Sequence, residues 1–118
     1  LVAPQRFLAH FDPLLRAATA GRVVALTSSA AGGTRPYWSA YAASKAALET
    51  MVGAYSEEVR NISPVRVALL DPGATRTAMR ARAFPGEDPA TLKGPDAVGE
   101  EIAALLLRGF ETGARVRV

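Results

Sequence analysis

The sequence predicts an α/β protein with a parallel sheet, on the basis of three observations. Residues 22–27 (RVVALT) and 65–70 (VRVALL) are short, almost unbroken apolar runs, as expected of strands that are buried on both faces. Residues 39–60, between them, are rich in alanine, leucine, methionine and glutamate, which favours a long helix. A strand, a helix and a second strand at this spacing form a βαβ unit, in which the two strands run parallel.

The segments before and within this unit have recognisable limits. Apolar residues recur at helical spacing over residues 4–18, which predicts an amphipathic helix that Pro13 kinks or shortens. Gly21 marks the turn into the first strand, and glycines and a proline after that strand predict a loop. The long helix has room for about six turns and ends at residues 61–64.

The rest of the chain adds a loop, a helix and a strand. Residues 74–93 are interrupted by prolines and a glycine and predict a long functional loop with one short helix. Proline and aspartate after Gly94 begin a helix with IAALLL on its buried face, ending near residues 109–113. Residues 114–118 (ARVRV) alternate between apolar and charged, as an edge strand does. One domain accounts for this length of chain.

The composition argues against several classes of protein. The formal charge of +3 comes from scattered arginines without a basic run, so nucleic-acid binding is not expected. The lack of cysteine excludes disulfides and thiolate metal sites, and no segment reaches the roughly 18 apolar residues of a membrane span. We expect a cytoplasmic protein. The only histidine, His10, is predicted to lie on the polar side of the first helix and to take no part in catalysis.

The stretch SAYAASKAA, at residues 39–47, places one phenol and one ammonium among small side chains. Tyr41 and Lys45 are four residues apart on the predicted helix, so they project from the same face. An ammonium stabilises a nearby phenolate, which makes the phenol a usable proton donor and acceptor. The surrounding alanines leave room for a large, flat ligand. A packed tyrosine beside a solvated lysine is the alternative for this motif taken alone.

Two further motifs stand where the predicted strands end. Ser28 and Ser29 follow the first strand, and DPGATRT, at residues 71–77, follows the second. The carboxyl ends of parallel strands meet at one edge of the sheet, where open α/β sheets bind ligands. Each motif alone also fits ordinary turn chemistry. Together with Tyr41 and Lys45 they predict a site at this edge.

In this order, TSSAAG, YAASKAA and DPGATRT resemble the serine, tyrosine-lysine and Pro-Gly segments of the short-chain dehydrogenase/reductases. The resemblance covers essentially the whole chain and implies a Rossmann-like, doubly wound parallel sheet. It implies that Tyr41 is the catalytic acid/base, that Lys45 stabilises its phenolate and holds the nicotinamide ribose, and that Ser29 hydrogen-bonds the reacting oxygen. No metal is implied.

The resemblance leaves two serines to choose between. Ser29 stands three residues before Gly32, as the serine of the family usually does, and we therefore assign the role to Ser29. The usual spacing between that serine and the tyrosine would select Ser28 instead. A loop that is one residue shorter before Pro36 would reconcile the two counts.

The resemblance also implies an NAD or NADP cofactor, with Tyr41 and Lys45 among its contacts. Further contacts are expected from the Pro-Gly segment: Pro72 and Gly73 beside the nicotinamide, and Thr75 and Thr77 beyond them. The implied reaction is reversible hydride transfer between this cofactor and a small-molecule carbonyl or alcohol. The substrate, the choice of NAD or NADP and the direction of reaction are not encoded in these motifs.

Several features of the family are missing from the chain, including its Gly-rich first turn and its NNAG-like segment. We therefore expect residues 1–118 to be the carboxyl-terminal part of one domain, with about three strands and without the amino-terminal dinucleotide-binding half. The open strand edge predicts that the isolated chain is associated and inactive. The intact protein is expected to be a homo-oligomer.

Two alternatives remain for the function. One is a catalytically silent relative that binds ligands, and the other is a structural subunit. The loop arginines Arg76, Arg80 and Arg82 are interpreted as a solvated lid, although pairing with an acidic substrate or a cofactor phosphate is the alternative.

Overall fold

The computed structural model describes all of residues 1–118. Four α-helices, two short 3₁₀-helices and three strands follow one another along the chain. In order they are α1 (Val2–Ala17), β1 (Arg22–Leu26), η1 (Ser29–Gly32), α2 (Ser39–Arg60), β2 (Arg66–Asp71), α3 (Ala78–Ala83), η2 (Pro89–Thr91), α4 (Pro95–Arg108) and β3 (Ala114–Arg117).

The three strands form one parallel sheet in the order β1-β2-β3. Along the first pair the register runs from Arg22 opposite Arg66 to Leu26 opposite Leu70. Helix α2 connects β1 to β2, and α4 connects β2 to β3, so each crossover has the βαβ form that parallel strands require. The predicted α/β fold is therefore confirmed.

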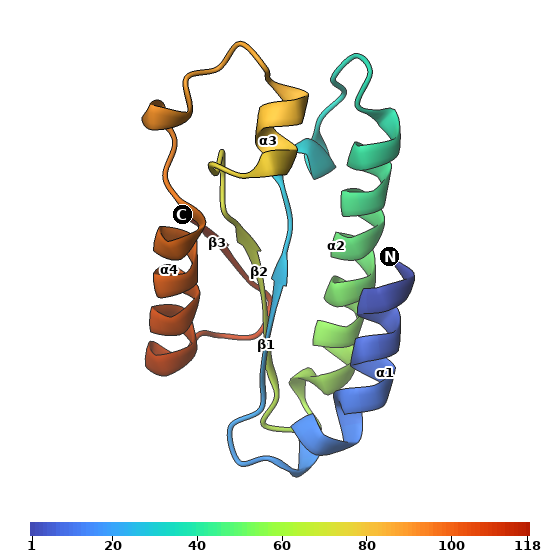
Figure 1. Ribbon diagram of the computed structural model, residues 1–118. Helices are drawn as coiled ribbons and strands as arrows, with labels where there is room; N and C mark the ends of the chain where they lie inside the picture. Colours follow the sequence, from blue (N-terminus) through green and yellow to red (C-terminus); the bar gives the residue numbers. More distant parts are fainter.

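Helices cover both faces of the sheet: α1 and α2 lie on one side and α4 on the other (Figure 1). The two faces have separate cores because successive side chains of a strand point to opposite sides. Val67 belongs to the α2 core, which includes Val52 and Val59, whereas Leu70 packs with Val98 and other residues of α4. None of the helices is both long and apolar enough to cross a membrane.

Helix α1 packs along α2 through Leu8 and Leu15. A polar contact supports this packing, because the Tyr55 hydroxyl donates to Asp12 Oδ1 at 2.8 Å and Asp12 also accepts from Arg16. Burial raises the pKa of Tyr55 to about 12, with a further contribution from the Asp12 carboxylate. Pro13 lies inside α1 without ending it, contrary to the expectation of a shortened helix.

The two sheet edges differ from the centre in burial. Central β2 is largely buried, whereas β1 is only half-buried, contrary to the expectation of burial on both faces. The reason is that β1 pairs with β2 on one side only. Edge strand β3 alternates between half-buried and exposed residues, as predicted.

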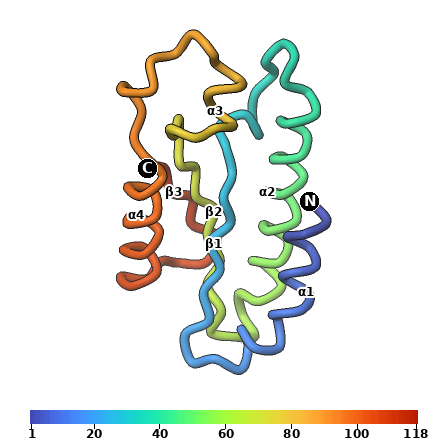
Figure 2. Tube along the Cα trace, viewed as in Figure 1, coloured from blue at the N-terminus to red at the C-terminus, as the bar shows by residue number.

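The segment from the end of β2 to the start of α4 passes over the carboxyl ends of the strands, and so does the connection from β1 to α2 (Figure 2). The first contains α3 and η2, so the predicted loop with one short helix has a second, 3₁₀ turn as well. The connection after β1 was predicted as a loop, but its first part is the 3₁₀-helix η1.

Candidate active site

A cleft of about 870 Å³ opens at the carboxyl ends of the strands. It is lined by the end of β1, the start of α2, the turn after β2, helix α3, the first half of α4 and the end of β3. Every one of the predicted catalytic segments reaches this edge of the sheet, as the strand-end argument requires.

The two serines after β1 have different hydrogen bonding. The Ser28 hydroxyl accepts a hydrogen bond from the backbone N–H of Ala30 at 3.2 Å and caps η1. Ser29 is the first residue of η1; it is exposed, lines the cleft and makes no side-chain hydrogen bond within the chain. Both hydroxyls line the cleft and keep a hydrogen to donate, and Ser29 differs in having no partner within the chain.

Tyr41 and Lys45 lie on the first two turns of α2, and the half-buried Tyr41 lines the cleft. The Lys45 ammonium is 6.0 Å from the centre of the Tyr41 ring. It also donates a hydrogen bond to the carbonyl oxygen of Leu26 at 3.1 Å. Lys45 thus connects the tyrosine-bearing helix to the last residue of β1.

A second connection between α2 and β1 comes from Glu49, one turn beyond Lys45. Its carboxylate accepts hydrogen bonds from the buried hydroxyl of Thr27, at 2.5 Å, and from the Arg115 guanidinium, at 2.5 and 2.9 Å. The bonds from Arg115 hold the pKa of Glu49 below its ordinary value, with a smaller contribution from Thr27. The sequence analysis missed Glu49, although its spacing of four from Lys45 placed it on the same face.

The Pro-Gly turn after β2 presents bare backbone to the cleft. Gly73 has a φ of 67°, a conformation that favours glycine, and its N–H donates to Asp71 Oδ1 at 2.9 Å. The Thr75 hydroxyl donates to the carbonyl of Gly73 at 3.2 Å. The Thr77 hydroxyl accepts from the Arg80 N–H at 3.1 Å and caps α3, which leaves its own hydrogen to donate.

Aromatic residues from two distant segments meet beside Tyr41. The Trp38 ring stands edge-on to the Tyr41 ring at 5.5 Å and lies 5.6 Å from the Phe84 ring. The Arg80 guanidinium lies over the Phe84 ring, 3.7 Å from its centre. Arg80 also forms an ion pair with Glu87 through two hydrogen bonds. Sequence reasoning missed this contact because Trp38 and Phe84 are far apart in the chain.

Other candidates lie outside the cleft. His10 is exposed on α1, as predicted for a surface residue. Of the loop arginines, Arg80 lines the cleft, whereas Arg76 and Arg82 are exposed and do not. No three histidine, aspartate or glutamate side chains gather where they could hold a metal ion.

The structure thus combines a parallel α/β sheet with a serine, a tyrosine and a lysine at its carboxyl edge, where open α/β sheets bind ligands. Residues 2–88 match the family model described as short chain dehydrogenase. The chain therefore belongs to the short-chain dehydrogenase family.

Known relatives agree with this assignment. The chain is 48% identical over 83 residues to the "uncharacterized oxidoreductase YciK" of Escherichia coli K12, covering 70% of this chain and 32% of the relative. The solved structure of the yciK oxidoreductase from E. coli has a TM-score of 0.89 and 37% identity, covering 99% of this chain and 48% of that one.

Two of the similar solved structures contain a nicotinamide nucleotide. A short chain dehydrogenase from Shigella flexneri, complexed with NADP, has a TM-score of 0.88 and 37% identity over 99% of this chain and 49% of that one. One from E. coli CFT073, complexed with NADPH, has a TM-score of 0.79 and 40% identity over 89% and 44%. The chain spans about half the length of these structures.

Proposed function

We propose that this chain is the carboxyl-terminal, catalytic half of an oxidoreductase that uses NAD or NADP to interconvert a carbonyl compound and an alcohol. The observation that supports this most directly is that Ser29, Tyr41 and the backbone of Gly73 line one cleft, with the Lys45 ammonium 6.0 Å from the Tyr41 ring. The membership of the family and the nucleotides bound by two similar structures support the choice of cofactor.

The Pro72-Gly73 turn lines the cleft, and Gly73 contributes backbone only. Exposed backbone allows a planar group to lie directly against the chain. Pro72, Gly73, Thr75 and Thr77 would hold the nicotinamide end of the cofactor, and Lys45 its ribose. When bound, the cofactor supplies or accepts the hydride.

The proton is handled by the chain's own residues. During reduction Tyr41 donates its hydroxyl proton to the substrate oxygen, and during oxidation its phenolate removes the alcohol proton. The Lys45 ammonium, near the ring, stabilises the phenolate that remains. The exposed Ser29 hydroxyl donates a hydrogen bond to the same substrate oxygen and holds it within reach of Tyr41. Proton transfer of this kind contributes about 10²- to 10⁴-fold to a rate.

We further propose that an amino-terminal half precedes residue 1 and pairs with the open edge of β1; the protein so formed is called the complete enzyme below. The unpaired edge and the coverage of about half of each similar structure support this. The exposed apolar residues Phe7, Phe11 and Leu14 on α1 support a homo-oligomer. A small-molecule substrate and a cytoplasmic location belong to the same proposal, without nucleic-acid or membrane partners.

The test measures cofactor binding and turnover separately. The complete enzyme is titrated with NADH and NADPH by calorimetry and then assayed with a panel of aldehydes, ketones and alcohols. We expect binding of at least one cofactor and turnover of some panel members. Binding without turnover would indicate the catalytically silent alternative, and absence of both would overturn the proposal.

The 118-residue chain alone is the matched control. We expect it to bind neither cofactor at micromolar concentration and to associate through β1, because unpaired backbone on a hydrophobic edge pairs with other chains. Sedimentation measures the association. A monomer that binds either cofactor tightly would show that this half is sufficient by itself.

A further inference from the structure

The wall of the cleft beside Tyr41 is aromatic. Trp38 is half-buried, lines the cleft and contacts both the Tyr41 ring and the Phe84 ring. Met79 and Ala83 of α3 continue the same lining with apolar atoms. Aromatic faces of this kind favour flat, apolar ligand bodies, which stack on them or meet them edge-on. A substrate whose carbonyl reaches Tyr41 would have its remaining atoms against this wall.

The lining of the cleft also carries an excess of positive charge. It includes three arginines, Arg35, Arg80 and Arg117, and a single carboxylate, that of Asp71. Glu87 already occupies the guanidinium of Arg80. Arg117, at the end of β3, stands opposite Asp71 in the strand register, and none of the four ion pairs of the chain includes it.

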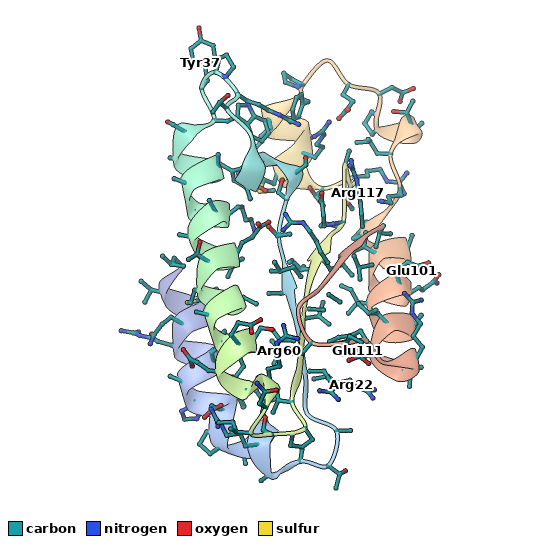
Figure 3. The ribbon with its side chains drawn as sticks, turned by 180° about the vertical axis from the view of Figure 1, so that it is seen from behind. Arg22, Tyr37, Arg60, Glu101, Glu111 and Arg117 are labelled. Atoms are coloured by element: carbon teal, nitrogen blue, oxygen red, sulfur yellow. The ribbon has the colours of Figure 1, made fainter.

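Arg35 is the cation of the lining that contacts Trp38 and has no carboxylate partner. It is exposed, and none of the four ion pairs of the chain includes it. Its guanidinium lies 5.8 Å from the centre of the Trp38 ring, so the free charge is next to the aromatic wall. The loop that carries it turns sharply at Tyr37, whose φ is 68° and whose side chain projects into solvent at the tip of the loop (Figure 3).

We propose that the substrate of this site is a flat carbonyl compound that bears a carboxylate. Its planar body lies against Trp38, its carboxylate pairs with Arg35, and its carbonyl reaches Tyr41 and Ser29. A guanidinium binds a carboxylate through two parallel hydrogen bonds, which is the geometry that favours arginine at such positions. The proposal rests on the proposed function, because it assigns a substrate class to the same cleft.

The test uses three aldehydes that differ in one property each. 4-Carboxybenzaldehyde is flat and charged, 4-methylbenzaldehyde is flat and uncharged, and cyclohexanecarbaldehyde is uncharged and not flat. With the complete enzyme and its reduced cofactor, we expect kcat/KM to fall in this order, with about a tenfold preference for the carboxylated aldehyde over its methyl analogue.

Two variants test which side chains cause the preference for the flat, carboxylated aldehyde. Arg35→Gln should raise KM for 4-carboxybenzaldehyde about tenfold and leave 4-methylbenzaldehyde unchanged. Arg82→Gln is the matched control, because it removes the same charge from an exposed position that does not line the cleft. Trp38→Leu should reduce the preference for the flat aldehydes over the cyclohexane compound.

A binding measurement separates failure of this inference from failure of the proposed function. Trp38 is the only tryptophan of the chain, so its fluorescence reports occupancy of the cleft, with Trp38→Phe as the blank. The carboxylated aldehyde is titrated in the presence of oxidised cofactor, and quenching that Arg35→Gln weakens supports the inference even if no aldehyde is reduced. Equal turnover of the three aldehydes, equal effects of Arg35→Gln and Arg82→Gln, or no quenching at all would overturn it.

Discussion

The two walls of the cleft are built in different ways. On one side, Ser29 of η1 and Tyr41 of α2 line the cleft, with Lys45 next to Tyr41 on the same helix; we call this side the framework wall. It is connected to the sheet by the Lys45 bond to Leu26 and by the buried bond between Thr27 and Glu49. On the other side, the loop wall consists of residues 72–93, in which α3 and η2 are short and mostly exposed.

The loop wall is held by a backbone bridge between Thr75 and Lys93, by the Arg80–Glu87 pair and by the contact between Phe84 and Trp38. Catalytic residues need rigid support to keep their geometry, whereas loop residues determine which ligands the site accepts. Changes in the framework wall should therefore affect turnover and folding stability, and changes in the loop wall should affect KM.

The largest effect is expected at the phenol of the framework wall. Tyr41→Phe in the complete enzyme should lower turnover about 10²- to 10⁴-fold, because the ring still packs but has no proton to transfer. Cofactor affinity, measured by fluorescence titration, should change little. Tyr37→Phe is the control: Tyr37 borders the same cleft, but its side chain is fully exposed and has no assigned role, so turnover should stay intact. Turnover within tenfold of the parent would remove Tyr41 from the role of acid/base.

The two serines should separate catalysis from local stability. Ser29→Ala should reduce kcat/KM about 10²-fold without changing the unfolding midpoint, because this hydroxyl has no partner within the chain. Ser28→Ala removes the cap of η1 and should cost about 1 kcal/mol of folding free energy, with a smaller effect on rate. Paired kinetic and thermal unfolding measurements decide this, and the opposite order of rates would assign the role to Ser28.

Loss of the Glu49 carboxylate should weaken the support of the framework wall. Glu49→Ala leaves the buried Thr27 hydroxyl without its acceptor, and should lower the free energy of unfolding by about 2 kcal/mol. Glu49→Gln keeps an oxygen for Thr27 and should lose about half as much. Denaturant titration measures both; equal stability of all three proteins would show that this contact supports nothing.

The same carboxylate should make stability depend on acid pH. Because Arg115 lowers the pKa of Glu49 in the folded state, its contribution is fully present above the ordinary value of 4.5 and is lost as pH falls through the lower folded value. The difference in unfolding free energy between the parent and Glu49→Gln should therefore shrink below pH 4.5. A difference that stays constant from pH 7 downwards would contradict the assigned charge.

The smallest effect is expected in the loop wall. Glu87→Gln releases Arg80, and should raise KM about threefold while leaving kcat and the unfolding midpoint unchanged, because pairs near the surface contribute little to stability. Glu57→Gln is the control: it breaks the pair with Arg60, whose residues do not line the cleft. A fall in kcat as large as that expected for Tyr41→Phe would contradict the proposed difference between the two walls.

Much of this architecture could be predicted from the sequence. The apolar runs at β1 and β2 and the alanine-rich helix between them predicted a parallel α/β sheet, and α2 spans Ser39–Arg60 as expected. Tyr41 and Lys45 were placed on one helical face by their spacing alone. These features depend on local periodicity, which records burial and backbone geometry within a single element. Their catalytic roles remain a prediction.

Only the tertiary structure decided which side chains meet across the cleft. The Thr27–Glu49–Arg115 contact joins the end of β1, α2 and β3. Trp38 comes before β2 in the sequence and Phe84 comes after it, yet their rings are in contact. No local pattern specifies such pairs, because they depend on strand register and on the path of a loop that has no periodicity. The hydrogen bonding of the two serines was also decided by the structure: their spacings to Gly32 and to Tyr41 favoured different serines, and only the fold of η1 makes Ser28 its cap and leaves Ser29 without a partner in the chain.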